Sequence, residues 1–543
     1  MATIAENPQS RRRRQPAAVP EWTPSRSAAG RHNPWTIAWI LSIATFMEVL
    51  DTAIANVSLR HIAGSLAAGL DESTWVITSY LVANAVILPV SGWLSDVIGR
   101  KRFYMGCVAI FTVASLLCGL ATSLPQLIFF RVLQGIGGGG LVPSEQAMLA
   151  DTFAPKDRGK AFALYGLAVV VAPTLGPTLG GWITDSYSWH WVFLINVPVG
   201  IASLFLCAQF IDEPRAVVRE RLRKLRGGLK VDYIGFALVA IGLGSLELML
   251  DEGERYDWFS SPFVRTFAVV AAVSLVSMVL WEWYHRDPVF DVRLLKNRNF
   301  AVCMFMMCIV GFTLYSTTTL IPMVLQTQHG YTALLAGLVL TPGGLMTLLC
   351  MPLVGYLTTK VPLRNLLAFG LFVLGLATWH MSKFPSNLTF MTAMQARIFQ
   401  AASLGFLFIP ITTLSYHGLA AGRNNVASAM LTVARNISGS VGIALTGTLL
   451  AQRTQYHHAV LVEHVNPYNP AAQNALQGLS NLGSGSVGGA APGLGVLDGL
   501  INRMSGIMAF NDVAFVMGIG VLGALVFVPL LVRARAEGGP AAH

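Results

Sequence analysis

Charged side chains are scarce in this chain, since only 12% of its 543 residues are Asp, Glu, Lys or Arg. Soluble domains carry about a quarter of such residues. The hydrophobic fraction is 54%, and the mean hydropathy is +0.58. This balance excludes an ordinary soluble protein and indicates an all-α polytopic membrane protein.

Cysteine is also rare, and its positions exclude a metal site. The six cysteines lie inside apolar runs without the spacing of metal ligands, so they are expected to pack as small hydrophobic side chains. Histidines are scattered, and the pair His457-His458 lies in an expected loop without a partner cluster. No metal, cofactor or catalytic constellation is therefore expected, and a membrane-embedded enzyme is the disfavoured alternative.

Apolar runs of about 20 residues predict the membrane spans. No cleavable signal is expected, because the first 34 residues are polar and basic and lead straight into a full-length span. The fourteen expected spans are 35–56, 75–95, 103–122, 126–149, 160–182, 190–210, 233–250, 264–282, 300–321, 333–357, 364–381, 388–415, 426–450 and 511–532.

The distribution of basic residues predicts the orientation. With the N-terminus inside, 28 of the 37 Lys and Arg residues fall on the cytoplasmic side, so both termini are expected to be cytoplasmic. The net charge of +10 then needs no nucleic-acid partner. The expected cytoplasmic segments are a disordered N-terminus at 1–34, linkers at 211–232 and 283–299, and a tail at 533–543. The basic run 215–230 is interpreted as a topological anchor rather than a lipid-binding helix.

Two internal matches indicate a duplicated architecture. Pro89-Val-Ser-Gly92 is matched 263 residues later by Pro352-Leu-Val-Gly355, and Arg131-Val-Leu-Gln134 is matched 266 residues later by Arg397-Ile-Phe-Gln400. Such duplication is typical of secondary transporters, whose substrate site lies between the halves. We expect six-helix halves at 35–210 and 300–532, with two inserted helices at 233–282. The segment 451–510 is expected to be a long outside loop, of a length that is usually functional or disordered.

The loop after the second span resembles the loop motif of the major facilitator superfamily. It reads Gly92-Trp-Leu-Ser-Asp96-Val-Ile-Gly99-Arg100-Lys101. Asp96 at a helix end beside Arg100 and Lys101 is expected to form a charge cluster that locks the cytoplasmic face. Gly92 and Gly99 permit close approach and a tight turn.

Three further motifs resemble the fourteen-span drug:proton antiporter family, and the likeness to its EmrB type extends over nearly the whole chain. They are Gly176-Pro177-Thr-Leu-Gly180-Gly181, Leu50-Asp51-Thr-Ala-Ile-Ala-Asn56 and Arg131-Val-Leu-Gln134-Gly135. The resemblance implies a proton-coupled exporter of small hydrophobic or amphiphilic compounds in the bacterial inner membrane. It also implies a periplasmic adaptor protein and, through it, an outer-membrane channel as partners. Glu48 and Glu145 depart from the family pattern.

Charged residues inside the spans predict the coupling site, because a charge at membrane depth is costly and is normally retained for function. Asp51 lies five residues before the expected outer end of its span, and Arg131 lies five residues after the outer start of its own. At about 1.5 Å per residue the two lie at matched depth and can pair. Glu48 shares a helical face with Asp51 and is expected level with Gln134.

Asp51 is expected to be the principal proton carrier and Glu48 an auxiliary group. Burial favours the protonated form of Asp51, whereas Arg131 favours the charged form, so alternating access could change how tightly Asp51 holds its proton. Asn56, Gln134, Arg397, Gln400 and Arg435 complete an expected polar ladder and substrate path. A static buried ion pair is the alternative, and it is the preferred interpretation for Arg397 and Arg435. An importer of the same fold is a further alternative, which the antiporter motif disfavours.

Overall fold

The computed structural model describes residues 33–532 apart from 213–217, 219–231, 286–287, 289, 387, 418, 420–422, 467 and 483–490. The expected N-terminal segment, most of the 211–232 linker and the 533–543 tail therefore lie outside the described residues. The described part contains helices and no strand, as expected for an all-α membrane protein.

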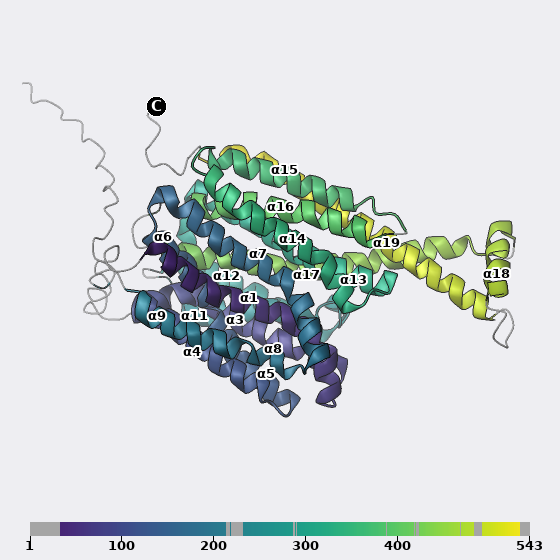
Figure 1. Cartoon of the computed structure of the whole chain (residues 1–543), viewed down its shortest axis with the longest axis horizontal. Coiled ribbons are helices and arrows are strands. Elements are labelled where there is room, and N and C mark those ends of the chain that lie inside the picture. Colours follow the sequence, from purple (N-terminus) through teal and green to yellow (C-terminus); the bar gives the residue numbers. More distant parts are fainter. Residues whose placement is uncertain are drawn as a thin grey trace, which may run out of the picture.

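The N-terminal half forms one bundle and the C-terminal half another, and they lie side by side in Figure 1. The N-terminal half consists of α1 (Pro34–Ser65), α2 (Leu70–Ser73), α3 (Trp75–Ile98), α4 (Arg100–Gly119), α5 (Leu124–Gly138), α6 (Leu141–Thr152), α7 (Pro155–Ser186), α8 (His190–Leu194) and α9 (Asn196–Phe210). The C-terminal half consists of α13 (Arg298–His329), α14 (Ala333–Leu357), α15 (Leu363–Met381), α16 (Phe390–Ser415), α17 (Asn424–Glu463), α18 (Pro470–Leu482), α19 (Ala491–Gly523) and the short η3 (Ala524–Leu530).

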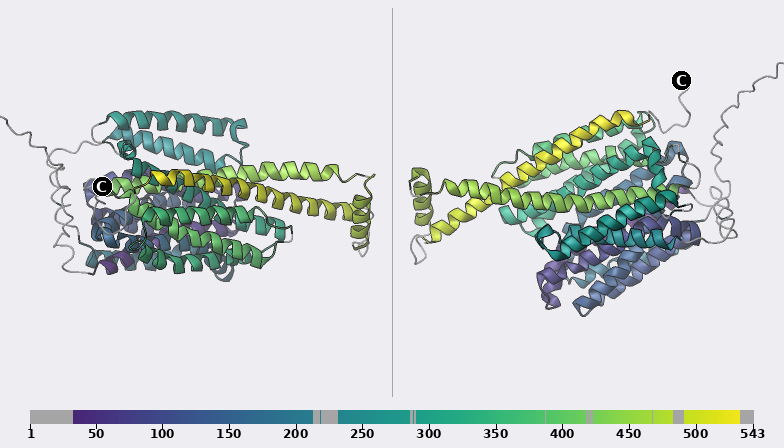
Figure 2. Two further views of the ribbon diagram at one scale, coloured as in Figure 1. Left: turned by 90° about the horizontal axis from the view of Figure 1, so that it is seen from above. Right: turned by 180° about the vertical axis from the view of Figure 1, so that it is seen from behind.

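Between the halves come α11 (Tyr233–Glu252) and α12 (Pro262–Tyr284), which occupy the expected insertion and lie along one edge of the bundle (Figure 2). Short 3-10 turns, η1 (Trp258–Ser260) and η2 (Val292–Lys296), flank α12. The helix starts follow from local sequence. Asn33 caps α1 ahead of Pro34, and Ser261 caps α12 ahead of Pro262. A side-chain acceptor followed by proline favours the first turn of a helix.

Twelve helices of the described part are long and apolar enough to cross a membrane. A thirteenth candidate is α7, which bends by 46° between Asp157–Pro173 and Leu175–Ser186. The remaining expected span, 426–450, falls in α17, whose 40 residues are long enough but are not among these apolar candidates. The count of fourteen and the cytoplasmic position of the termini stay predictions.

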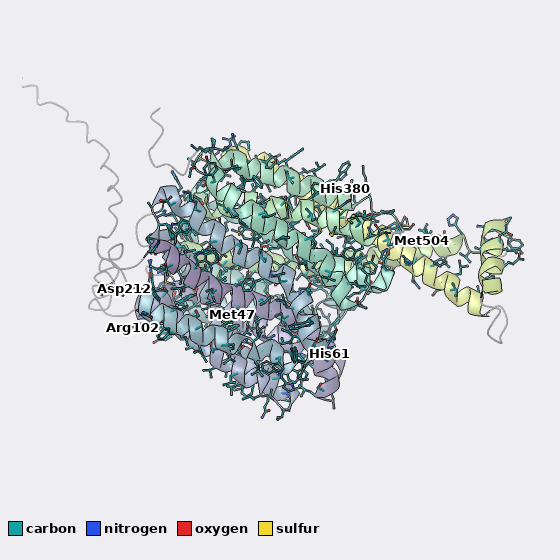
Figure 3. All side chains as sticks on the ribbon, in the orientation of Figure 1. Met47, His61, Arg102, Asp212, His380 and Met504 are labelled. Atoms are coloured by element: carbon teal, nitrogen blue, oxygen red, sulfur yellow. The ribbon has the colours of Figure 1, made fainter. Side chains whose placement is uncertain are left out.

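Two ends of the bundle serve as landmarks below. Arg102 and Asp212 lie at one end, which we call the loop end because it holds the turn between α3 and α4, and His61 lies at the opposite, far end (Figure 3). Gly99 makes this turn with a φ of 103°, a backbone conformation that favours glycine. The tight turn predicted at Gly99 is confirmed.

The expected loop 451–510 is largely helical instead. The C-terminal part of α17, then α18 and the first part of α19 form a projection beyond the far end (Figures 1 and 2). Residues 448–466 contain neither glycine nor proline, so nothing in the sequence stops α17 where its apolar run stops. Low hydropathy there marks the exit from the membrane rather than the end of the helix.

Each histidine of the projection has one acidic partner on α19, and within the described residues the pair belongs to no cluster that could hold a metal ion. His457 Nε2 lies 2.9 Å from Asp512 Oδ2, and His458 Nε2 lies 3.4 Å from Asp498 Oδ1. Arg453 Nε lies 3.6 Å from the same Asp512 oxygen. Residues about 40 to 55 positions apart meet here only because α17 and α19 run side by side.

Candidate coupling site

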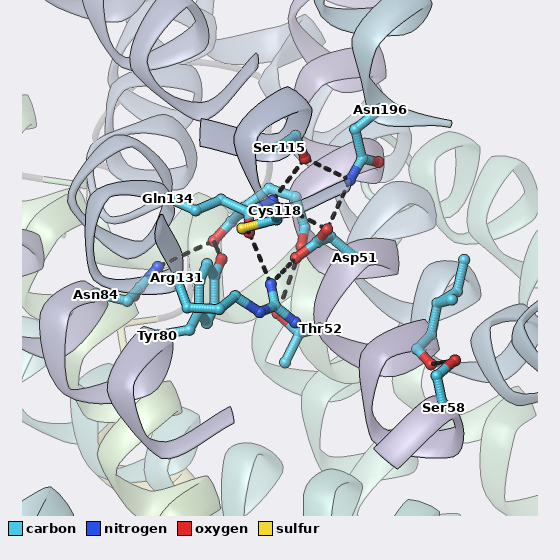
Figure 4. Close-up of polar contacts among 12 residues, drawn as sticks. Asp51, Thr52, Ser58, Tyr80, Asn84, Ser115, Cys118, Arg131, Gln134 and Asn196 are labelled. Carbon is cyan, nitrogen blue, oxygen red and sulfur yellow. Dashed lines mark hydrogen bonds and ion pairs between the residues drawn. The ribbon is translucent and has the colours of Figure 1, made fainter. Parts of the chain in front are cut away.

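Asp51 on α1 and Arg131 on α5 form a buried ion pair, which confirms the predicted pairing. Arg131 Nη1 donates to Asp51 Oδ2 at 2.6 Å, and their side chains are 1% and 0% exposed, respectively (Figure 4). The guanidinium also lies over the rings of Tyr80 and Phe193, with centroid distances of 5.2 Å and 4.7 Å. Aromatic faces attract a cation, so they help to hold Arg131 in the apolar interior.

The other carboxylate oxygen of Asp51 accepts two amide hydrogen bonds. Gln134 Nε2 donates at 3.0 Å and Asn196 Nδ2 at 2.6 Å, and both amides also donate to Ser115 Oγ (Figure 4). Helices α1, α5 and α9 therefore meet at one carboxylate, and α4 supplies Ser115 as the second acceptor of both amides. Asn196 and Ser115 were missed from sequence, although Asn196 is the polar residue in the otherwise apolar run Phe193-Leu-Ile-Asn196-Val.

Glu48 is buried one turn before Asp51 but has separate partners. Its Oε1 accepts from Tyr80 Oη at 3.4 Å and from Asn84 Nδ2 at 3.3 Å, both on α3, and its Oε2 is buried without a hydrogen-bond partner. Glu48 and Gln134, which were expected at the same depth, share no hydrogen bond. The amide of Gln134 turns back to Asp51 because its oxygen accepts from Arg131 Nη1 at 2.8 Å.

Two other predicted or flagged residues of this half lie apart from the Asp51 network. Asn56 is exposed and makes none of the hydrogen bonds described for Asp51. Glu145 on α6 is fully buried and accepts from Ser42 Oγ of α1 at 2.7 Å. The N-terminal half thus buries three carboxylates, of which Asp51 is ion-paired within the described residues.

In the C-terminal half the predicted residues form two separate groups. Arg397 on α16 donates to Thr317, Thr318 and Gln400 at 3.1, 3.0 and 2.7 Å. Arg435 on α17 reaches across to the N-terminal half and donates to Tyr165 Oη at 2.7 Å. Neither guanidinium has a carboxylate within 4.0 Å in the described residues, so the static ion pair preferred for both from sequence is wrong.

The loop motif joins the two halves at the loop end. Arg100 forms an ion pair with Asp151 of α6, and Asp96 accepts from Asn425 of α17. Asn424 Nδ2 also donates to Asp151 Oδ1, at 2.7 Å. The predicted cluster residues lie on α3 and α4, and the contacts of Asp96 and Arg100 reach α17 and α6.

Two smaller contacts complete this end of the molecule. Lys101 Nζ donates to the carbonyl of Ala208 at 2.8 Å, so it ties α4 to α9. A Cβ on Gly92 would lie 3.2 Å from the carbonyl oxygen of Asn425, which confirms the predicted close approach at this glycine.

The antiporter motif presses α7 against α1 beside Asp51. A Cβ on Gly176 would lie 2.3 Å from Ala53 Cβ, and one on Gly180 would lie 3.1 Å from Ile54. Pro177 follows closely on the bend of α7. Gly181 has open space around its Cβ position and takes no part in this contact. The predicted close packing and bend are confirmed.

The inserted helix α11 contacts both halves. Asp251 accepts from Thr78 of α3, whereas Glu247 Oε1 accepts from Ser440 Oγ of α17 at 2.7 Å. Trp258 Nε1, just after α11, donates to Thr448 Oγ1 of α17 at 2.8 Å. These contacts were not predicted, because sequence spacing does not report which neighbours an inserted helix meets.

Two helical bundles, the first of which encloses a buried ion pair, are the architecture of a membrane transporter, and the comparisons agree. The model of the Major Facilitator Superfamily matches residues 41–443, so the chain belongs to that family. The chain is similar to the multidrug export protein EmrB of Escherichia coli K12, with 38% identity over 82% of this chain and 85% of the relative. EmrB of Haemophilus influenzae is 36% identical over 90% of this chain and 94% of the relative. The fatty acid resistance protein FarB of Neisseria gonorrhoeae is 34% identical over 91% of this chain and 95% of its own length.

Solved structures support the fold. The proton:xylose symporter XylE superposes with a TM-score of 0.54 at 14% identity, over 88% of this chain and 94% of its own. The human organic anion transporter MFSD10 gives a TM-score of 0.57 at 11% identity, over 91% of this chain and all of its own.

Proposed function

We propose that this protein is a proton-coupled antiporter that exports hydrophobic or amphiphilic compounds across the bacterial inner membrane. The observation that carries this proposal is the fully buried Asp51, held by Arg131, Gln134 and Asn196. The relatives named as multidrug export proteins support export as the direction of transport. An importer of this fold is the alternative.

The ion pair supplies a proton-binding group whose two states differ in structure. When Asp51 is charged, it binds Arg131 and draws α1 and α5 together. When Asp51 is protonated, the pair loses its attraction and the amide donors lose a charged acceptor, so the contact weakens. A conformation that separates Asp51 from Arg131 thus favours proton uptake, and one that restores the pair favours release. Substrate moves outward as the proton moves inward.

Proton release from energised inverted vesicles tests this function. Adding dodecyltrimethylammonium, a cationic amphiphile, or another member of a panel of amphiphiles should release stored protons from vesicles that contain the wild-type protein. Asp51→Asn keeps the size of the side chain and removes its proton site, so it should abolish release and the pH dependence of substrate binding. Arg131→Ala should also abolish release, because the carboxylate loses its cationic partner.

Each outcome of this experiment separates the alternatives. Movement of protons and substrate across the vesicle membrane in the same direction would indicate an importer. Normal release by Asp51→Asn would place the proton on another group, with Glu48 the next candidate.

The projection is the proposed docking site for a periplasmic adaptor protein, and through it an outer-membrane channel. Helices α17, α18 and α19 extend beyond the far end, and they expose apolar side chains there. These side chains include Tyr456, Tyr468, Leu494 and Val496. Exposed apolar groups outside the membrane are typical of protein contacts.

A further inference from the structure

The C-terminal half repeats two of the three residues that hold Asp51, namely Arg131 and Gln134. In the N-terminal half, Arg131 Nη1 donates to Gln134 Oε1 at 2.8 Å and to Asp51 at 2.6 Å. In the C-terminal half, Arg397 Nη1 donates to Gln400 Oε1 at 2.7 Å. The two Arg–Gln pairs are 266 positions apart, and 266 positions after Asp51 the chain has Thr317. Thr317 stands where the first half has its carboxylate.

This second group of donors lacks its negatively charged acceptor. Gln134 Nε2 donates to Asp51, whereas Gln400 Nε2 is buried without a hydrogen-bond partner. Thr317 and Thr318 offer Arg397 their hydroxyl oxygens at 3.1 and 3.0 Å. These hydroxyls donate to the carbonyls of Thr313 and Leu314, each at 2.7 Å, and they carry no charge.

Helices α13 to α16, which hold and surround this group, contain no carboxylate that could supply that charge. Residues 292–462 contain neither Asp nor Glu, and Arg397 is only 1% exposed. Within the described residues no carboxylate oxygen lies within 4.0 Å of its guanidinium. A buried guanidinium without a counter-charge is strongly destabilising, so a bound anion would lower its free energy.

We propose that Arg397, Gln400, Thr317 and Thr318 form an anion-recognition site that binds the carboxylate head of an amphiphilic substrate. This inference rests on the proposed export function and names one substrate class for it. The substrate carboxylate takes the place that Asp51 takes in the first half, accepting from Arg397 and from the free amide of Gln400. The same three helices, α13, α14 and α16, contribute Leu320, Leu340 and Ala396 to one buried apolar cluster, and Ala396 directly precedes Arg397, so an alkyl chain bound beside the group would meet apolar side chains.

Placing the missing carboxylate on the protein tests the site. Thr317→Asp should pair with Arg397 and exclude the substrate anion, whereas Thr317→Asn has the same shape without the charge. With purified full-length protein in detergent, dodecanoate affinity should fall at least tenfold in Thr317→Asp, or about 1.4 kcal/mol. It should change by less than about threefold in Thr317→Asn. Arg397→Gln should lose dodecanoate binding as Thr317→Asp does.

Matched probes show whether charge is what the site recognises. The affinity of dodecyltrimethylammonium, which has the same chain length and the opposite charge, should not fall in Thr317→Asp. An equal loss of both probes, or an unchanged dodecanoate affinity, would overturn the proposal. Displacement of dodecanoate by an equal concentration of chloride would show a small-anion site and would also overturn it.

Folding and transport controls keep the two proposals separate. Thr317→Asp gives Arg397 a counter-ion, so its thermal unfolding temperature should equal or exceed that of the wild type, and failure to fold would contradict the site. If dodecanoate binding follows these expectations but no amphiphile releases protons from vesicles, the anion site stands and the proton-coupled function fails.

Discussion

At the scale of single residues, Asp51 and Glu48 show how one helical turn separates two carboxylates with different surroundings. Asp51 has a cation and two amides as partners, whereas Glu48 has a phenol and one amide. A carboxylate without an adjacent cation is more easily accommodated in the membrane interior when it is protonated. Asp51 is therefore the better candidate for a group that changes charge during transport.

Glu48→Gln tests the auxiliary role of the second carboxylate. The amide keeps the hydrogen-bonding shape beside Tyr80 and Asn84, so transport should persist while the pH optimum or the substrate range shifts. Vesicle transport measured over a range of pH checks this, with Asp51→Asn as the inactive comparison. A folded Glu48→Gln protein without any transport would reverse the ranking of the two carboxylates.

Gly176→Ala tests the packing of the antiporter motif. The new methyl group would lie 2.3 Å from Ala53 Cβ, so α7 must move away from α1. Overpacking of this kind costs about 1–3 kcal/mol. We expect a lower thermal unfolding temperature and slower transport. Gly181→Ala is the matched control, because no atom lies within 4 Å of its Cβ position, and it should behave as wild type.

The sequence predicts the ion pair at this scale but not its full surroundings. Two opposite charges within apolar runs are rare enough to single out Asp51 and Arg131. Ser115 and Asn196 give no such signal, because uncharged polar residues are common in membrane helices and often bond to their own backbone. Their place in the Asp51 network depends on how α4 and α9 pack, which spacing along the chain does not report.

At the scale of helices, hydropathy locates the apolar part of each span but not where the helix ends. The first span is expected to end at residue 56, yet α1 continues to Ser65. In the same way, helices continue beyond the apolar runs in the segment 451–510, which was expected to be a loop. There α17 and α19 extend past the expected spans, and α18 lies between them in the chain. Hydropathy measures preference for lipid, whereas helix length depends on backbone propensity, and only the former changes at the membrane surface.

Shortening the projection tests the adaptor proposal. Replacing residues 464–490 by a short Gly-Ser link removes α18 and keeps the His457–Asp512 contact between α17 and α19. Drug resistance in cells should be lost, because the adaptor can no longer dock, while proton-coupled transport in vesicles should remain. Loss of both activities would indicate that the projection supports the fold.

At the scale of the whole molecule, the internal repeat predicts two halves, and the structure shows where they meet. Asp96 with Asn425 and Asp151 with Asn424 join them at the loop end, and Arg435 with Tyr165 joins them deeper in the bundle. The repeat offset even predicts the equivalence of Arg131 and Arg397. It does not predict that their partners differ, since that depends on which side chain faces each guanidinium.

Helix α17 is long enough to connect the loop end of the bundle directly with the projection. Its 40 residues form one helix of about 60 Å, which carries Asn424 and Asn425 at one end and part of the projection at the other. Because α17 is continuous, its first residues at the loop end and its last residues in the projection move together. Turning a helix of this length by about 10° about its loop end sweeps its tip through on the order of 10 Å. A movement of the halves at the loop end would therefore appear, enlarged, at the projection, where the proposed adaptor would dock.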